Sequence, residues 1–146
     1  MPTAARLVAA ILMAALAYIL SDLVRPLMPE GTDFGYFNYV NAFIGLCVGW
    51  VAVGSRGGRG LVPGINNGLT GTALLFIWTI GTHACYEMFR LAMRNRYDGP
   101  MEAIAGIFLI ASEFAYMIAT VPMLLAALVG AVVVGLATEY AAKTWR

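Results

Sequence analysis

Charged side chains are scarce in this sequence: Asp, Glu, Lys and Arg together make up 12% of its 146 residues. A typical soluble domain has about 25% charged and about 45–50% apolar residues. Here hydrophobic residues reach 61%, which is more apolar surface than a 15.6 kDa globule can hide from water. The shortage of charge excludes an ordinary soluble domain and predicts an integral membrane protein. A net charge of +1 also leaves no basic surface for a nucleic-acid partner.

Side chains that bind metals or carry redox chemistry are equally scarce. The chain has one histidine, His83, and two cysteines, Cys47 and Cys85, in separate apolar runs. We expect two buried free thiols, because a disulfide framework usually contains more cysteines. On a helix, His83 shares a face with Glu87, while Cys85 points about 200° away. Since metal sites need three or four converging ligands and a Cys/His nucleophile needs one shared face, we predict no enzyme, no catalytic or metal residue and no cofactor. Glu87 is expected to pair with Arg90.

Long apolar runs are what the sequence has in abundance. A helix needs about 20 apolar residues to cross the hydrocarbon layer of a bilayer. Each run is expected to be helical, because lipid offers no partner to backbone polar groups. The sequence therefore predicts an all-α, integral membrane helical bundle with four to five transmembrane helices, forming a single domain over residues 1–146. The expected spans cover residues 5–24, 37–53, 65–85, 101–119 and 121–142.

The number of crossings depends on residues 101–119. Because Pro122 leaves almost no loop after this run, a fifth crossing needs a tight hairpin there. We favour five crossings over four. With five, the positive-inside rule makes the side of Arg25, Arg90 and Lys143 cytoplasmic; with four, both sides carry nearly equal numbers of basic residues and the orientation stays open.

One glycine-rich stretch, SRGGRGLVPGINNGLTG at residues 55–71, interrupts the apolar runs. Walker-type and dinucleotide-binding loops both follow a strand, and the Walker type also needs a lysine. This stretch follows an expected membrane helix and has no lysine, so we predict a turn rather than a nucleotide site. Asn66 and Asn67, at the mouth of the next span, can cap that helix or bond to a neighbouring one. Residues expected at lipid headgroups or the membrane interface are Arg56, Arg59, Arg94, Arg96 and Trp145.

Small residues recur four positions apart within several runs. This spacing lets the backbones of two membrane helices approach closely. The residues that we predict at helix-packing contacts are Gly45, Gly49, Ala127, Ala131 and Gly135.

Glu113 is an ionisable side chain at membrane depth, inside residues 101–119. A carboxylate there costs about 2.5–3.5 kcal/mol on insertion scales, so we expect Glu113 to face protein in its neutral form. Two interpretations stay open: a proton or ion relay, or an acid bonded to a neighbouring helix. Candidate partners are Tyr18, Asn41 and Thr79. The helical period places further residues on the same stripe: Glu102, Gly106, Tyr116 and Thr120. The predicted intramembrane polar residues are Asn66, Asn67, His83 and Glu113.

Several phrases of the sequence together resemble one family, and so does their order. They are MPTAARLVAA at residues 1–10, PEGTDFGYF at 29–37, INNGLTG at 65–71, MRNRYDGP at 93–100 and GLATEYAAK at 135–143. In these phrases the whole chain resembles the TrgA family of small bacterial membrane proteins. The family name refers to tellurite resistance, and its members occur mainly in Rhodobacter-like alphaproteobacteria, many of them phototrophs. The resemblance implies a multi-pass protein of the bacterial inner membrane, and it carries over no catalytic residues.

Three classes of function are compatible with these observations. The first is a non-enzymatic inner-membrane protein associated with tellurite resistance, as the resemblance implies. The second is a structural or accessory subunit of a larger respiratory or photosynthetic complex, such as a reaction centre with its light-harvesting proteins. The third is a minimal channel or carrier that uses Glu113. The expected partners are membrane lipids and other membrane protein subunits, not nucleic acid; no cofactor is expected, while lipid or pigment contacts stay open.

Overall fold

The computed structural model describes residues 3–27 and 36–145, which form helices joined by short turns, with no strand in either range. The all-α prediction is confirmed. Residues 29–35 of the PEGTDFGYF phrase lie outside the described ranges. The five α-helices are α1 (Thr3–Val24), α2 (Phe37–Val48), α3 (Leu61–Ala92), α4 (Pro100–Ile118) and α5 (Val121–Thr144). A 3₁₀ turn follows α1 (Arg25–Leu27), and α2 continues through a π-helical stretch (Gly49–Val53) into a second 3₁₀ turn (Gly54–Arg56).

Among the described residues, four stretches are long and apolar enough to cross a membrane, and each overlaps a predicted span. The fifth predicted span, residues 65–85, lies inside α3, which is not among these four. Its 32 residues include Asn66, Asn67 and His83, which dilute the apolar side chains. The number of stretches that could cross a membrane thus equals the lower of the two predicted numbers, four. The predicted span that does not qualify is the one in α3, whereas the sequence had placed the doubt on residues 101–119. The four stretches are Ala4–Leu27, Phe37–Arg56, Pro100–Ile118 and Val121–Thr144.

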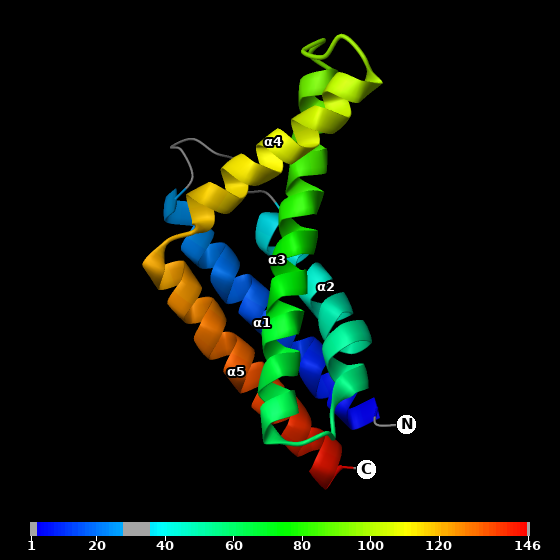
Figure 1. The fold of residues 1–146 in the computed structure, drawn as a ribbon, viewed down its shortest axis with the longest axis vertical. Coiled ribbons are helices and arrows are strands. Elements are labelled where there is room, and N and C mark those ends of the chain that lie inside the picture. Colours follow the sequence, from blue (N-terminus) through cyan, green and yellow to red (C-terminus); the bar gives the residue numbers. More distant parts are fainter. Residues whose placement is uncertain (1–2, 28–35, 146) are drawn as a thin grey trace.

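The helices are arranged as a bundle of four with a fifth helix at one end (Figure 1). α1 and α5 lie side by side, α2 packs on α1, and the first half of α3 packs on α5. The two chain ends lie at the same end of the molecule. α4 instead folds back along the C-terminal half of α3, against Ala84 and Met88, and reaches α5 through Ala119 and Thr120. Only 11% of the α4 span is buried, against 33–44% of the other three spans, so α4 is the most exposed to its surroundings.

Two glycines let α2 lie directly against α1. A Cβ atom on Gly45 would come within 2.5 Å of the carbonyl oxygen of Met13, and one on Gly49 would collide with the backbone of Ala9. Both glycines are buried. Their four-residue spacing therefore places two backbones in contact, which is the packing that this spacing predicts.

Small residues also set the distance between α3 and α5. A Cβ atom on Gly68 would collide with the backbone of Ala131, and one on Gly135 with that of Gly64. Ala127 is buried on the same face of α5. The predicted packing residues of α5 thus lie in this contact, whereas their partners in α3 were not predicted, because they belong to the glycine-rich stretch.

Candidate functional site

The turn between α2 and α3 wraps around one carboxylate of α5. The backbone N–H groups of Gly58 and Arg59 donate to Oε2 of Glu139, at 2.8 and 3.2 Å. The N–H of Gly60 donates to Oε1 at 2.7 Å. Gly58 and Gly60 have φ values of 94° and 123°, which side chains rarely adopt, and this backbone turns three N–H groups toward one point. The glycine-rich stretch is therefore an anion cradle, and its anion belongs to the protein itself.

Glu139 is 2% exposed and lies close to the C-terminal end of α5. The Nζ atom of Lys143, one turn further on, is 3.6 Å from its Oε1. Together with the three N–H groups, this cation compensates a charge that would otherwise be costly to bury. An external phosphate could occupy the cradle only by displacing Glu139.

Sequence reasoning missed Glu139, although a signal was present. An acid near the C-terminal end of a helix lies where the helix dipole favours a cation. Glu139 occupies such a position in a largely apolar helix, where Lys143 is the one cation near it, and this position indicates further partners from elsewhere in the chain.

The residues predicted at the membrane interface are all exposed. They lie in the turn of the anion cradle, in the turn between α3 and α4, and at the C-terminal end of α5, where Trp145 packs edge-on against Tyr140. The prediction of interface residues depended on their lying at helix ends, and these residues do so. These residues are Arg56, Arg59, Arg94, Arg96 and Trp145.

Of the two predicted amides, Asn67 is the one that bonds to a neighbouring helix within the part of the chain that the structure describes. Its Nδ2 atom donates to the carbonyl oxygen of Val53, 2.7 Å away at the end of the π-helical stretch. Asn67 is buried, whereas Asn66 is exposed. Because carbonyl groups at a helix end lack partners within the helix, Asn67 satisfies a group that would otherwise be buried without one.

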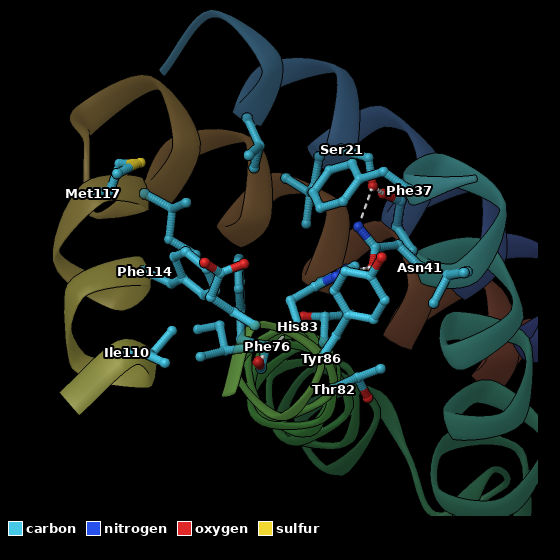
Figure 2. A pocket seen from close by; sticks show the side chains of 18 of the residues that line it. Ser21, Phe37, Asn41, Phe76, Thr82, His83, Tyr86, Ile110, Phe114 and Met117 are labelled. Atoms are coloured by element: carbon cyan, nitrogen blue, oxygen red, sulfur yellow. Dashed lines mark hydrogen bonds between the residues drawn. The ribbon is translucent and has the colours of Figure 1, made fainter. Parts of the chain in front are cut away.

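A cavity of about 1070 Å³ opens between α1, α2, the C-terminal half of α3 and α4 (Figure 2). Its wall is largely apolar and includes Leu20, Leu75 and Ile110. Pockets for small molecules usually enclose about 300–1,000 Å³ and combine an apolar wall with a few converging polar groups. The polar side chains that line this cavity are Ser21, Asn41, Thr79, Thr82, His83, Glu87, Arg90 and Glu113.

Three of these side chains, each from a different helix, form a hydrogen-bonded chain on one wall (Figure 2). Nε2 of His83 on α3 lies 2.7 Å from Oδ1 of Asn41 on α2. Nδ2 of Asn41 donates to Oγ of Ser21 on α1 at 2.8 Å, and that hydroxyl donates to the carbonyl oxygen of Ala17 at 2.7 Å. This Ser21–Asn41–His83 chain ties the three helices together at the cavity.

The direction of the Ser21–Asn41–His83 chain sets the tautomer of the histidine. Because Ser21 gives its hydrogen to Ala17, it can only accept from Asn41, which leaves Oδ1 of Asn41 as an acceptor. Nε2 of His83 must then be the donor, and Nδ1 of the neutral ring keeps its lone pair. The ring also lies against Phe37, with centroids 4.6 Å apart. His83 therefore acts as a fixed polar group of the cavity wall.

Glu113 lines the same cavity from α4, and it is an exposed residue. Its expected partners are engaged elsewhere: Asn41 belongs to the chain described above, and the hydroxyl of Thr79 donates to backbone carbonyls of its own helix. The ring of Tyr18 packs edge-on against Tyr39. Within the described ranges Glu113 has no hydrogen-bond partner, so the expectation that it packs inside protein is replaced by a position on an open cavity.

The other members of the Glu113 stripe do not share one environment. The carboxylate of Glu102 accepts the N–H of Asp98 at 2.9 Å, and Gly106 packs against the ring of Tyr97. Tyr116 is 87% exposed. The stripe is therefore not a continuous polar path, because α4 packs mainly on α3 and leaves much of its surface outward.

The structure also bears on the predicted pair of Glu87 with Arg90 and on the two cysteines. The pairing of Glu87 with Arg90 is confirmed, with 2.6 Å between Oε1 and Nη2. Cys47 and Cys85 are free, as predicted, but the expectation that both are buried is wrong: Cys47 is exposed and Cys85 half-buried. Cys47 lies in a stretch that is apolar enough to cross a membrane, where lipid rather than protein could cover its side chain. In the described ranges, no group of three His, Cys, Asp or Glu side chains is placed to hold a metal ion.

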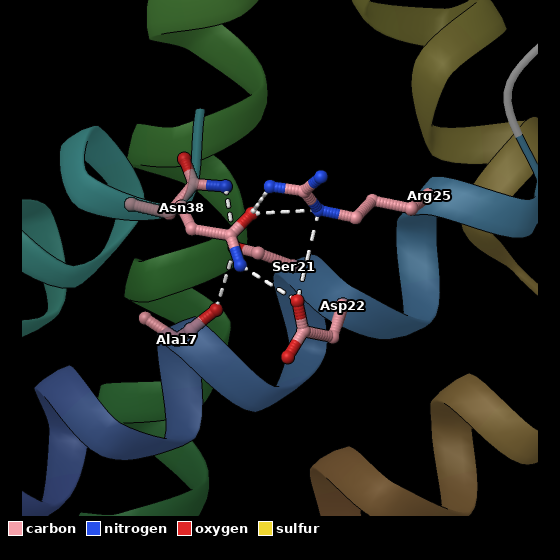
Figure 3. A network of polar contacts seen from close by, with 6 residues as sticks. Ala17, Ser21, Asp22, Arg25 and Asn38 are labelled. Atoms are coloured by element: carbon pink, nitrogen blue, oxygen red, sulfur yellow. Dashed lines mark hydrogen bonds and ion pairs between the residues drawn. The ribbon is translucent and has the colours of Figure 1, made fainter. Parts of the chain in front are cut away.

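A second polar cluster fixes the start of α2 against the end of α1 (Figure 3). Nδ2 of Asn38 donates to Oδ1 of Asp22 at 2.7 Å, and Oδ1 of Asn38 accepts from Nε and Nη2 of Arg25 at 3.2 and 3.0 Å. Asn38 is 2% exposed, so its amide is held firmly between these groups. Asn41 lies one turn further along the same face of α2, and the cluster therefore helps to position it at the cavity. Sequence reasoning missed Asn38 and Ser21; their signal was the pairing of polar residues three or four positions apart inside apolar runs.

The chain matches no protein-family model, no curated protein and no solved structure.

Proposed function

We propose that this protein is a non-enzymatic, multi-pass protein of a bacterial inner membrane that contributes to tellurite resistance by binding a small molecule in the cavity between α1, α2, α3 and α4. The link to tellurite rests on the resemblance to the TrgA family. The binding role rests on one observation: a hydrogen-bonded chain from three helices, Ser21–Asn41–His83, lines a largely apolar cavity. Such convergence of a few polar groups in an apolar pocket is the usual form of a binding site.

Binding accounts for the arrangement of the polar groups better than catalysis does. Nε2 of His83 is held by Asn41, and Cys85 lies on the next-but-one position of α3, where its side chain diverges from that of His83. Cys47 is on α2 and exposed. A reduction of tellurite by a vicinal dithiol would need two thiols within bridging range, and these two belong to different helices and different environments.

Survival of cells on tellurite tests the proposal. In cells that lack the native gene, the wild-type protein should restore survival, while Asn41→Leu and His83→Phe should each lower it at least tenfold. Ser112→Ala is a matched control, because that exposed hydroxyl bonds only to its own helix on α4. Membrane abundance of every variant must be measured. Wild-type survival with both cavity variants at normal abundance would refute a role for the cavity.

One observation also favours a second candidate, an accessory subunit of a larger membrane complex. α4 packs mainly on α3, and its large apolar side chains Phe108 and Leu109 are 69% and 63% exposed. Phe108→Ser with Leu109→Ser would weaken a protein contact on this surface. In mild detergent the wild-type protein should then migrate in a large complex and the double variant alone. Migration of the wild type as a single chain would exclude this candidate.

A further inference from the structure

We propose that the cavity takes a lipophilic cation, an amphiphile with an ammonium head and an apolar tail. The inference rests on the proposed binding function and specifies its ligand. It follows from the charge of the cavity wall, from the direction of its hydrogen bonds and from the side chains that surround them.

The charge of the wall favours a positively charged head. Glu87 and Arg90 form an ion pair and compensate each other. Nε2 of His83 donates to Asn41. Glu113 is then the one acidic group of the wall without a partner among the described residues. A carboxylate facing an apolar cavity attracts a cation and repels an anion, so the tellurite oxyanion itself does not fit this site.

Several polar atoms of the wall are left as acceptors, beside the hydroxyl groups of Tyr36 and Tyr86 and the remaining N–H groups of Arg90. When the His83 ring is neutral, Nδ1 keeps a lone pair, because Nε2 carries the hydrogen. The hydroxyl hydrogens of Thr79 and Thr82 are directed to backbone carbonyls of α3, so these groups also offer lone pairs alone. Together with the Glu113 carboxylate, these atoms suit a ligand that supplies hydrogens. An ammonium group supplies up to three and accepts none.

Aromatic rings and apolar side chains account for the rest of the ligand. Rings attract cations through their faces. Apolar side chains from α1, α3 and α4 suit an alkyl or aromatic tail, and the cavity is large enough for both parts. The rings in the wall are Tyr36, Phe37, Phe76, Tyr86 and Phe114.

Titration of the purified full-length protein in nanodiscs of zwitterionic lipid tests this inference. The probe is a dansyl-labelled alkylamine, and its analogues carry a hydroxyl or a carboxylate in place of the amine. Fluorescence should show saturable binding of the amine, with a Kd at least tenfold below that of the hydroxyl analogue and no saturable binding of the carboxylate. Empty nanodiscs measure partitioning into lipid. Equal or tighter binding of either analogue would overturn the inference.

Variants of two acids on α4 assign the charge. Glu113→Gln should raise the Kd of the amine at least tenfold and leave that of the hydroxyl analogue unchanged, while its thermal unfolding stays that of the wild type. Glu102→Gln should leave both constants unchanged, because Glu102 bonds to the backbone outside the cavity. An unchanged amine Kd in Glu113→Gln would contradict the inference. Tellurite survival separates the two proposals. If Asn41→Leu loses survival and the wild type does not bind the amine, the proposed function stands and this ligand is wrong. If the wild type binds the amine and Asn41→Leu keeps wild-type survival, the ligand stands and the proposed function is wrong.

Discussion

A buried carboxylate near the end of a membrane helix is tolerated only when several groups compensate its charge, and Glu139 has four. Three are backbone N–H groups of the turn between α2 and α3, and the fourth is the ammonium group of Lys143. A hydrogen bond to a charged group contributes about 1.5–3 kcal/mol, so this single side chain fixes the turn and the end of α5 to each other.

Glu139→Gln should therefore destabilise the protein by about 2–4 kcal/mol, because an amide places its own N–H hydrogens against the N–H groups of the cradle. The midpoint of thermal unfolding, followed by circular dichroism in detergent, should fall clearly. Glu102→Gln, at an exposed acid, should change stability by less than about 0.5 kcal/mol. Equal midpoints for the two variants would show that the cradle contributes little.

The two cysteines belong to the same scale. Because Cys47 and Cys85 are free and lie on different helices, neither holds the fold together. We expect Cys47→Ser with Cys85→Ser to retain normal abundance and full tellurite survival. Complete loss of survival at normal abundance would instead favour direct thiol chemistry.

At the scale of the helices, glycine decides which surfaces meet. Gly45 and Gly49 bring α2 onto α1, and Gly64, Gly68 and Gly135 bring α3 onto α5. Without a hydrophobic driving force between helices in lipid, such close backbone contact is a main source of association.

Gly49→Leu should separate α1 and α2, because its side chain would occupy the space of the Ala9 backbone. We expect a loss of at least about 1–3 kcal/mol, the usual cost of overpacking. Gly81→Leu is the matched control: a Cβ atom there meets nothing within 4 Å, and leucine favours a helix over glycine by about 1 kcal/mol. If the unfolding midpoints of the two variants change by the same amount, this role of Gly49 is contradicted.

The helices themselves were predictable from the sequence, since a run of apolar residues in lipid has no alternative to a helix. Helix-packing glycines in α2 were predictable from their spacing, which is a local property. The contact of Glu139 with Gly58 and Gly60 was not, and neither was that of His83 with Asn41. Both depend on which helices become neighbours, and no local pattern in the sequence contains that information. The low apolarity of α3 is explained by the same kind of contact, because Asn67 and His83 of this helix bond to residues outside it.

At the scale of the whole molecule, the fold predicts a topology. By length and apolarity α4 qualifies as a span and α3 does not, but in the arrangement of the helices α1, α2, α3 and α5 run between the two ends of the bundle, while α4 folds back along α3 (Figure 1). The turn after α2 and the C-terminal end therefore lie together, and the turn between α3 and α4 lies at the far end. In a protein without native cysteines, Ser55→Cys and Thr144→Cys should react with an impermeant maleimide from one side of the membrane, and Asn95→Cys from the other. Asp33, in the loop between the expected spans 5–24 and 37–53, would be a natural position for the same test, but it lies outside the described residues. Labelling of Ser55→Cys and Asn95→Cys from one side would show that α3 does not cross.

The anion cradle also has a consequence for how the protein is made. Gly58 and Glu139 are 81 residues apart, so α1, α2 and α3 leave the ribosome well before the carboxylate that their turn requires. Until α5 arrives, three backbone N–H groups lack their acceptor, and the face of α3 with Gly64 and Gly68 lacks its partner. A chain that stops short of α5 would therefore remain open at that end of the bundle, where membrane proteases could recognise it as unfinished. Insertion of α5 would bring Glu139 to the turn between α2 and α3, and this contact would mark the completion of biogenesis.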